Sequence, residues 1–206
     1  MRKYDLMRML LCGMDFLLRK ALTSFGRVRF LILCTLWGAE WNGIGRFIGK
    51  IVIRNTRKGK IRFGKEVVLQ SSFRMNPIGA ASPCLLDVRP GGEIEIGDGT
   101  GMTSTIVSSA QKISIGKNCK IGGGVKILDH NFHAMDSEAR RNSGGDSKPR
   151  EISIGDDVFI GTNAIVLKGT RIGARSVIAA GSVVFGLDMP PDSLARGNPA
   201  EIVARK

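Results

Sequence analysis

The residues best suited to do chemistry are the chain's only two histidines, His130 and His133, which lie three positions apart. An imidazole ring has a reference pKa of ~6.5, so it can accept or donate a proton near neutral pH. A single isolated histidine is more often a surface or structural residue than a base. Two histidines confined to one short segment favour general acid–base chemistry there.

The other groups that could react are four cysteines, at Cys12, Cys34, Cys84 and Cys119. No pair has the C-x-x-C spacing, and no Cys/His cluster has the spacing of zinc ligands. This distribution indicates a reducing compartment and predicts neither a disulfide framework nor a metal site.

Both histidines stand at the start of residues 129–150, a polar and charged stretch without periodicity. The residues before and after it follow a regular repeat, so we expect it to loop out between Ile127 and Ile154. Long excursions from a rigid scaffold commonly carry function.

The scaffold predicted around this loop is a β-solenoid. Aliphatic residues recur every six positions at Ile154, Ile160, Val166, Ile172, Ile178 and Val184. Small or β-branched residues follow the first five by four positions, at Val158, Ala164, Thr170, Ser176 and Ser182. A period of six fits neither a helix nor a simple strand alternation. It is typical of hexapeptide units, each with one short strand and a turn, three of which close a triangular coil.

The same period continues toward the N-terminus. It predicts one coil from Ile115, Ile121 and Ile127, another that begins at Ile96 and Met102, and a degenerate one at Phe63, Leu69 and Met75. Residues 51–206 are therefore expected to form one all-β solenoid domain.

Residues 1–50 are expected to form a basic, amphipathic helical segment. Its apolar stripe, with spacings of three and four, comprises Met7, Leu10, Leu11, Met14, Leu17, Leu18, Ala21 and Leu22. Basic residues flank the stripe, and the second apolar run, residues 30–37, is too short to span a bilayer. These features favour a helix lying in a membrane interface. The alternative is an ordinary amphipathic helix packed on the body or on a neighbouring subunit.

The net charge of +13 is concentrated in the first third of the chain. Residues 1–75 hold 16 Lys and Arg against 4 Asp and Glu, or +12, and residues 76–206 hold 15 against 14, or +1. A nucleic-acid enzyme more often spreads basic side chains over its working face, so nucleic acid is not the expected partner. The expected partner is an anionic membrane surface. Charged residues interrupt the first apolar run, and no A-x-A site follows, so secretion is not expected.

Three segments resemble the hexapeptide-repeat acyltransferases: IGDDVFIGTNAIVLKGTRIG at 154–173, VIAAGSVV at 177–184 and ARGNPA at 195–200. The branch they resemble contains the galactoside and maltose O-acetyltransferases and the acetyltransferases of surface-polysaccharide pathways. The resemblance covers about residues 60–206. It implies a left-handed parallel β-helix, a homotrimer with active sites in the clefts between subunits, and acetyl-CoA as co-substrate.

The resemblance also implies a catalytic histidine at the start of the looped-out segment. His133 and the acidic and basic residues after it fit the order found in the galactoside and maltose enzymes, with Ala134 in place of Pro. His130 fits the simpler Asp-His pattern of other relatives. Asp129 or Asp136 is expected to orient the catalytic ring.

The positions that the resemblance implies for acetyl-CoA are turn residues with small side chains and a basic residue near the C-terminus: Gly161, Thr162, Ala180, Gly181 and Arg205. The chain departs from the family at residues 185–186, where Phe-Gly replaces the usual Thr-Lys. In the sugar enzymes an Asn at the position of residues 103–104 helps to hold the acceptor. This chain has no Asn there.

Together these features predict an acetyl-CoA-dependent O-acetyltransferase that works by direct transfer with a histidine general base. The expected acceptor is a saccharide or glycolipid of a surface-polysaccharide or glycolipid pathway, and the expected location is the cytoplasm, with peripheral contact at the inner membrane face. The alternatives are an N-acetyltransferase acting on an amino sugar or an antibiotic, and a catalytically silent trimeric scaffold.

Overall fold

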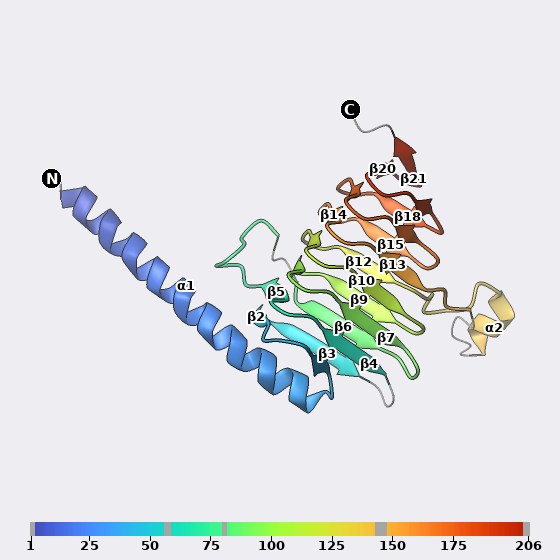
Figure 1. Ribbon diagram of the computed structural model, residues 1–206, viewed down its shortest axis with the longest axis horizontal. Helices are drawn as coiled ribbons and strands as arrows, with labels where there is room; N and C mark the ends of the chain where they lie inside the picture. The colour runs from blue at the N-terminus through green and yellow to red at the C-terminus, as the bar shows by residue number, and fades with distance from the viewer. Residues whose placement is uncertain (1–2, 56–58, 80–81, 143–147, 204–206) are drawn as a thin grey trace.

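The chain folds into a left-handed parallel β-helix preceded by one long helix, which confirms the predicted fold class (Figure 1). This computed structural model describes residues 3–55, 59–79, 82–142 and 148–203, with side chains from residue 12 onward. No helix in that part of the chain combines the length and the hydropathy needed to cross a bilayer.

Three parallel sheets form the sides of the solenoid. Sheet A contains β1 (Glu40–Trp41), β4 (Lys60–Phe63), β7 (Glu93–Ile96), β10 (Ile113–Ile115), β13 (Ile152–Ile154), β16 (Arg171–Ile172) and β19 (Asp188–Met189). Sheet B contains β2 (Arg46–Gly49), β5 (Val68–Ser71), β8 (Gly101–Thr103), β11 (Lys120–Ile121), β14 (Phe159–Ile160), β17 (Val177–Ile178), β20 (Leu194–Gly197) and the antiparallel β21 (Ala200–Val203). Sheet C contains β3 (Ile51–Asn55), β6 (Cys84–Val88), β9 (Ile106–Ser109), β12 (Lys126–Leu128), β15 (Ile165–Leu167) and β18 (Val183–Phe185).

Each sheet sends one column of aliphatic side chains into the interior. The hexapeptide positions pair in register between successive coils, as Ile115 with Ile154, Ile121 with Ile160 and Ile127 with Val166. All six of these side chains are at most 4% exposed. Burying one such side chain contributes ~1.5–3 kcal/mol, so the repeat of six is also the repeat of the stabilising contacts.

The turns between the sheets stack into three corners, which we name by the sheets they join. The A–B corner joins sheets A and B, and the B–C corner joins sheets B and C. The C–A corner returns the chain to sheet A and contains the long segment between β12 and β13.

One expectation about the degenerate coil is wrong. Phe63 and Leu69 point into the core as predicted, but the third inward position belongs to Leu86 and not to Met75. Met75 is half-buried in a turn-rich insertion between β5 and β6, at the B–C corner. The insertion displaced the hexapeptide register, and sequence periodicity could not follow it.

The helix α1 (Lys3–Leu36) ends well before residue 50, so the predicted helical segment is too long. Residues 40–49 instead supply β1 and β2 to the first coil. The last turns of α1 close the open end of the solenoid, because the fully buried Phe30 ring packs edge-on against Phe47 and Phe63, with centroids 4.9 and 5.5 Å away.

Candidate active site

The segment between β12 and β13 projects from the C–A corner with its two ends joined (Figure 1). At its base, the Arg150 N–H donates to the Asp129 carbonyl over 2.9 Å. Its short helix α2 (Ser137–Arg141) begins at Asp136, whose carboxylate accepts from the Ala139 N–H at 2.8 Å. The predicted excursion is confirmed as a projection with a closed base.

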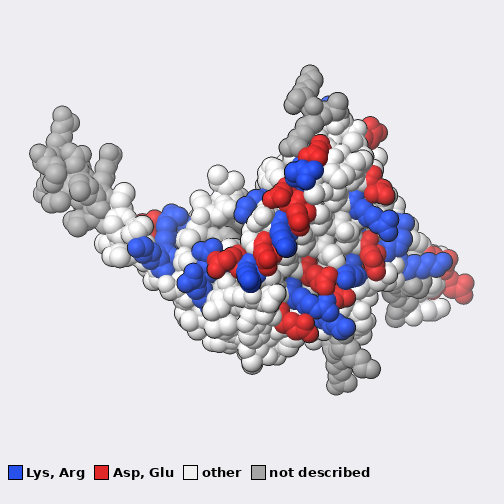
Figure 2. Space-filling model, in the orientation of Figure 1, with Lys and Arg blue, Asp and Glu red and all other residues white. Residues whose placement is uncertain are grey.

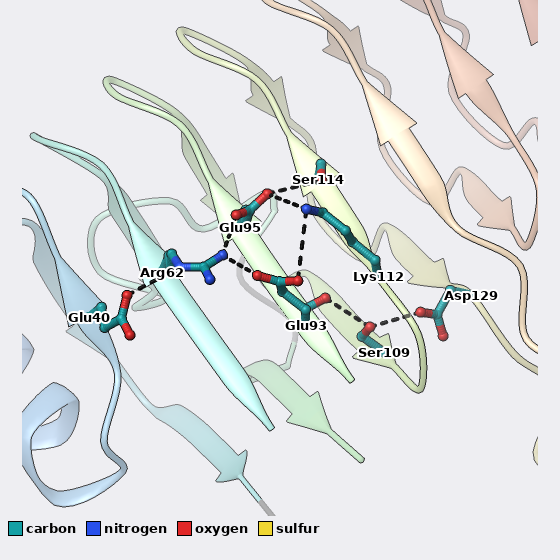
Figure 3. Close-up of polar contacts among 8 residues, drawn as sticks. All are labelled: Glu40, Arg62, Glu93, Glu95, Ser109, Lys112, Ser114 and Asp129. Carbon is teal, nitrogen blue, oxygen red and sulfur yellow. Dashed lines mark hydrogen bonds and ion pairs between the residues drawn. The ribbon is translucent and has the colours of Figure 1, made fainter. Parts of the chain in front are cut away.

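Asp129 anchors this base and does not orient a histidine. Its carboxylate is fully buried and accepts from the Ser109 hydroxyl at 2.8 Å and from the N–H groups of Ala110 and Gln111 at 2.7 and 2.9 Å. Figure 3 shows the contact with Ser109. Asp136 is occupied as the cap of α2. The expectation that either carboxylate orients the catalytic ring is therefore wrong.

An ion-pair network covers the neighbouring outer face of sheet A (Figure 3). Arg62 contacts both Glu93 and Glu95, and Lys112 lies 3.0 Å from Glu95. Burial alone raises the pKa of Glu95, but hydrogen bonds and charge from Lys112 and Arg62 outweigh it and leave that pKa lowered. These charges are paired with one another beside the loop base.

His130 is held in a defined position directly after β12. It is 4% exposed, and its Nδ1 lies 3.1 Å from the Asn131 carbonyl oxygen while its Nε2 lies 3.0 Å from the Ser108 hydroxyl. A carbonyl oxygen only accepts, so the contact requires the hydrogen on Nδ1. In the neutral ring Nε2 is then a proton acceptor.

Behind Ser108 stands a second buried group. The Ser108 hydroxyl donates to Asp87 Oδ2 over 2.9 Å, and both residues are less than 10% exposed. Arg54 and Arg89 lie 3.6 and 4.0 Å from the same carboxylate. Asp87, Ser108 and His130 thus form one chain of polar contacts on three successive coils.

Sequence reasoning missed Ser108 and Asp87 for a clear reason. They are neighbours because β6 and β9 pair with Asp87 opposite Ser108. That register follows from the insertion before β6, which the repeat did not predict. No motif in the sequence links the two residues.

His133 lies apart from this arrangement. It is exposed on the loop, and within the described residues its side chain makes no hydrogen bond or ion pair. Phe132 separates the two histidines and packs edge-on against His130, with the ring centroids 4.8 Å apart. The structure therefore orders one histidine and leaves the other in solvent.

The turn residues expected to contact acetyl-CoA lie at the B–C corner. Thr162, Ala180 and Gly181 are exposed, and Gly181 has a φ of 71°, which favours glycine. The N–H groups of Thr162 and Ala180 donate to no group among the described residues, whereas Gly181 N–H bonds the Thr162 carbonyl at 2.9 Å. Two backbone donors on successive coils are thus without a partner among the described residues.

Gly161 has a structural reason to be glycine. A Cβ atom there would lie 2.4 Å from the Ala180 nitrogen on the next coil. Arg205, the fifth predicted position, falls outside the described residues.

A hollow of about 460 Å³ opens beside the loop base at the C–A corner. Its lining residues include two arginines, Arg150 and Arg171, and one carboxylate, Glu151. The guanidinium of Arg150 also lies 5.3 Å from the Phe185 ring centroid. Coil stacking alone brings these arginines together, so the sequence carried no signal for them.

The predicted base and the predicted acetyl-CoA contacts do not meet within one chain. The histidines lie at the C–A corner and the four turn residues at the B–C corner, with sheet C between them. The two sets therefore lie at opposite edges of sheet C.

The three buried cysteines, Cys34, Cys84 and Cys119, offer no activated nucleophile. Burial raises the pKa of Cys34 to about 12, and it also raises the pKa values of Cys84 and Cys119. All four thiols are free. Within the described residues, no three His, Cys, Asp or Glu side chains gather as a metal site would require.

Comparison with known proteins places this fold in a family context. The family described as "Hexapeptide repeat of succinyl-transferase" matches residues 112–128 and 151–185. The Escherichia coli protein WbbJ, provisionally named a lipopolysaccharide biosynthesis O-acetyl transferase, is 31% identical over 160 residues, 74% of each chain. The galactoside O-acetyltransferase of Escherichia coli is 36% identical over 91 residues, 44% of this chain and 43% of the relative.

The chain spans about half the length of other curated relatives that it matches, between 43% and 57%. Among solved structures, a hexapeptide-repeat acetyltransferase of Vibrio cholerae is 26% identical, with a TM-score of 0.55 over 87% of this chain and 80% of that one. Its complex with acetyl coenzyme A is similar at 25% identity and a TM-score of 0.54, over 85% of this chain and 75% of that one.

Proposed function

Since the chain belongs to the hexapeptide-repeat acyltransferase family, we propose that it transfers an acetyl group from acetyl-CoA to a hydroxyl group of a saccharide. The observation that carries this proposal is the similarity to WbbJ, which spans three quarters of both chains and whose name refers to O-acetyl transfer. The galactoside enzyme supports the same acceptor class. The acceptor is accordingly a saccharide or glycolipid of surface-polysaccharide or glycolipid biosynthesis.

His130 is the proposed general base. As the acceptor oxygen attacks the thioester carbonyl carbon, Nε2 takes the hydroxyl proton. Nε2 can accept this proton because the hydrogen of the neutral ring is on Nδ1. The carbon–sulfur bond then breaks, and the proton passes to the departing CoA thiolate. This direct transfer needs no acyl-enzyme. His133, which the sequence order favours, is the alternative base.

Ser108 and Asp87 are proposed as positioning residues for that ring. With its own hydrogen donated to Asp87, Ser108 presents a lone pair to Nε2, so this 3.0 Å contact becomes a hydrogen bond once Nε2 carries the proton and donates it to the Ser108 oxygen. A lone pair at this place stabilises the protonated ring that forms during transfer, and the buried carboxylate adds a compensating charge. The acceptor hydroxyl must approach the same Nε2 edge of the ring.

Acetyl-CoA is proposed to lie along the B–C corner. The N–H groups of Thr162 and Ala180 are available for the carbonyl oxygens of the pantetheine arm, while Gly161 lets the coils stack closely and Gly181 adopts the positive φ of its turn. The nucleotide phosphates are proposed to meet basic side chains, either Arg205 or the pair Arg150 and Arg171 at the neighbouring copy's C–A corner. That pair would compensate for the missing family lysine.

The proposed assembly is a homotrimer with its sites in the clefts between subunits. Support comes from the separation of the two corners, since in one chain sheet C lies between the base and the acetyl-CoA turns. We further propose a cytoplasmic location with peripheral contact at the inner membrane face.

The test combines purified protein, acetyl-CoA and a panel of saccharide acceptors, with CoA thiol release and product mass as readouts. A product heavier by one acetyl group, and sensitive to mild base as an ester is, supports O-acetyl transfer. A product stable to mild base points to amide formation on an amino sugar or an antibiotic. Absence of both turnover and calorimetric binding of CoA would leave the silent trimeric scaffold.

A further inference from the structure

Helix α1 has two different faces, and only one of them touches the solenoid. The inner face consists of Gly26, Phe30, Leu33 and Cys34, and Phe30 and Cys34 are fully buried. A Cβ atom at Gly26 would lie 3.0 Å from the Phe47 carbonyl oxygen, so the helix backbone approaches β2 closely there. This face fixes the helix on the first coil.

The opposite face is a continuous apolar stripe without a partner in the described chain. Its large members recur at spacings of three and four and are between 43% and 71% exposed: Met14, Leu17, Leu18, Phe25, Val28, Ile32 and Leu36. At 100° per residue these positions fall on one side of the helix, away from Phe30 and Cys34. The sequence alternative of a stripe packed on the body is therefore wrong for these residues.

Cations lie on α1 between the stripe and the inner face. At 100° per residue, Lys20 and Arg27 stand about 60° and 80° around the helix from Leu17, the nearest edge of the stripe. A hollow of about 410 Å³ opens on the side turned away from the stripe, lined by Phe16, Arg19, Lys20, Thr23, Ser24 and Arg27. Within the described residues, Lys20 and Arg27 form no ion pair, and Lys20 lies 4.6 Å from the Phe16 ring centroid. Figure 2 shows basic side chains gathered along the helix, whereas both signs alternate over the solenoid.

The charge pattern selects the occupant of this surface. A second copy of the helix packed stripe to stripe would bring two basic helices together, and Asp15, the acidic side chain described in α1, is already paired with Arg19 and Arg74. A helix crossing the bilayer would place Arg19, Lys20 and Arg27 in hydrocarbon, at a cost of ~2.5–3.5 kcal/mol each. An anionic lipid surface can bury the apolar stripe and attract the cations at the same time.

We propose that α1 lies flat in an anionic membrane surface, with this outer stripe in the acyl boundary and with Lys20 and Arg27 at the lipid phosphates. The inner face then carries the solenoid on the aqueous side, with its first coil nearest the lipid. One helix thus serves as the cap of the core and as the membrane contact. The proposal specifies the binding surface of the proposed peripheral location and does not depend on acetyl transfer.

The consequence for the acceptor rests on the proposed function. A solenoid held at the lipid surface meets a lipid-linked saccharide by diffusion in two dimensions. A free saccharide gains nothing from this arrangement. Activity on a lipid-linked acceptor should therefore increase when vesicles containing it are anionic.

The experiment is vesicle flotation of the full chain with phosphatidylcholine alone and with equal parts of phosphatidylcholine and phosphatidylglycerol. Leu17→Glu combined with Val28→Glu disrupts the stripe, and each lost apolar contact should weaken binding about tenfold or more. Ile78→Glu is the matched control, because Ile78 is 94% exposed and lies outside α1. We expect wild type and the control to float with anionic vesicles, and the double variant to remain in the dense bottom fraction.

A second variant tests the cations. Lys20→Gln with Arg27→Gln should weaken binding to anionic vesicles about thirtyfold and leave binding to neutral vesicles unchanged, since each cation contributes ~1 kcal/mol near an anionic surface. Thermal melting of each variant establishes that the solenoid is intact.

Several outcomes would overturn the proposal. These are a wild type that ignores anionic vesicles, a stripe variant that floats like wild type, or a stripe variant that loses subunits in light scattering. The last result would assign the stripe to contacts between copies. Flotation needs no turnover, so it separates this proposal from failure of the acetyltransferase assay.

Discussion

The two corners that border sheet C have the same backbone architecture and opposite chemical character. At the B–C corner, from β11 onward, the turns are short and stack so tightly that Gly161 has no space for a Cβ atom. At the C–A corner the long segment after β12 interrupts the stack, and buried polar groups collect beneath it: Asp87, Ser108, Asp129 and His130. Regular turns offer backbone donors, and the interruption offers side-chain chemistry.

This difference has a physical origin. A hexapeptide turn that must repeat every coil cannot carry a large or charged inward group, because the coils above and below would clash with it. An interrupted turn escapes that constraint, and backbone N–H groups of the coil before it satisfy its buried carboxylate. The N–H groups that Asp129 binds show how.

The largest expected effect is the loss of turnover when the proposed base at the C–A corner is removed. His130→Ala should lower turnover by ~10²–10⁴-fold, because no other fixed imidazole can accept the acceptor proton. His133→Ala, the matched control, should stay near wild type. Steady-state CoA release measures both, and the reverse result would move the base to His133 and break the comparison.

A smaller effect is expected from filling the B–C stack. Gly161→Ala should cost ~1–3 kcal/mol of unfolding free energy, because its Cβ meets the backbone of Ala180 at 2.4 Å. Gly101→Ala is the control, since the nearest atom to its added Cβ is Lys120 Nζ at 4.0 Å. Denaturant unfolding should show a loss for the first variant alone, and equal stability would mean that the corner is not tightly stacked.

Ser108→Ala sharpens the role of the polar chain at the C–A corner. Removing one hydrogen bond to the ring should lower kcat about tenfold and leave the KM for acetyl-CoA unchanged. Ser108→Thr retains the hydroxyl and should recover most of the rate. A loss of thermal stability equal in both variants, with no split between kcat and KM, would make Ser108 merely structural.

The smallest signal tests whether the two corners cooperate between copies. Ala180→Trp blocks the acetyl-CoA turn, and His130→Ala removes the base. If they belong to one cleft between subunits, refolding the two inactive variants together should restore about a quarter of the sites. If mixtures stay as inactive as their parents, the site lies within one chain.

The six-residue period was sufficient to predict the solenoid, because each aliphatic position in 154–184 is also an inward position. The projecting segment was predictable for the same reason, as the place where the period stops. The first coil was not, since β1 and β2 replace helix at residues 40–49. Short strands there are stabilised by the aromatic cluster around Phe30, a contact that local propensity does not record.

The candidate site divides in the same way. The histidines could be found by their rarity, and the small turn residues by their place in the repeat. Which histidine is ordered could not be predicted, because the partners of His130 come from β6 and β9 through a register that an insertion had shifted.

By itself, the sequence determined the solenoid, its interrupted corner and the concentration of basic charge in residues 1–75. These follow from composition and spacing, which act locally and repeat along the chain. Only the tertiary structure decided that His130 is buried against Ser108, that the two corners of one chain stay apart, and that the stripe of α1 faces outward. Each of these depends on which surfaces the coils bury against one another, and burial is a property of the assembled fold.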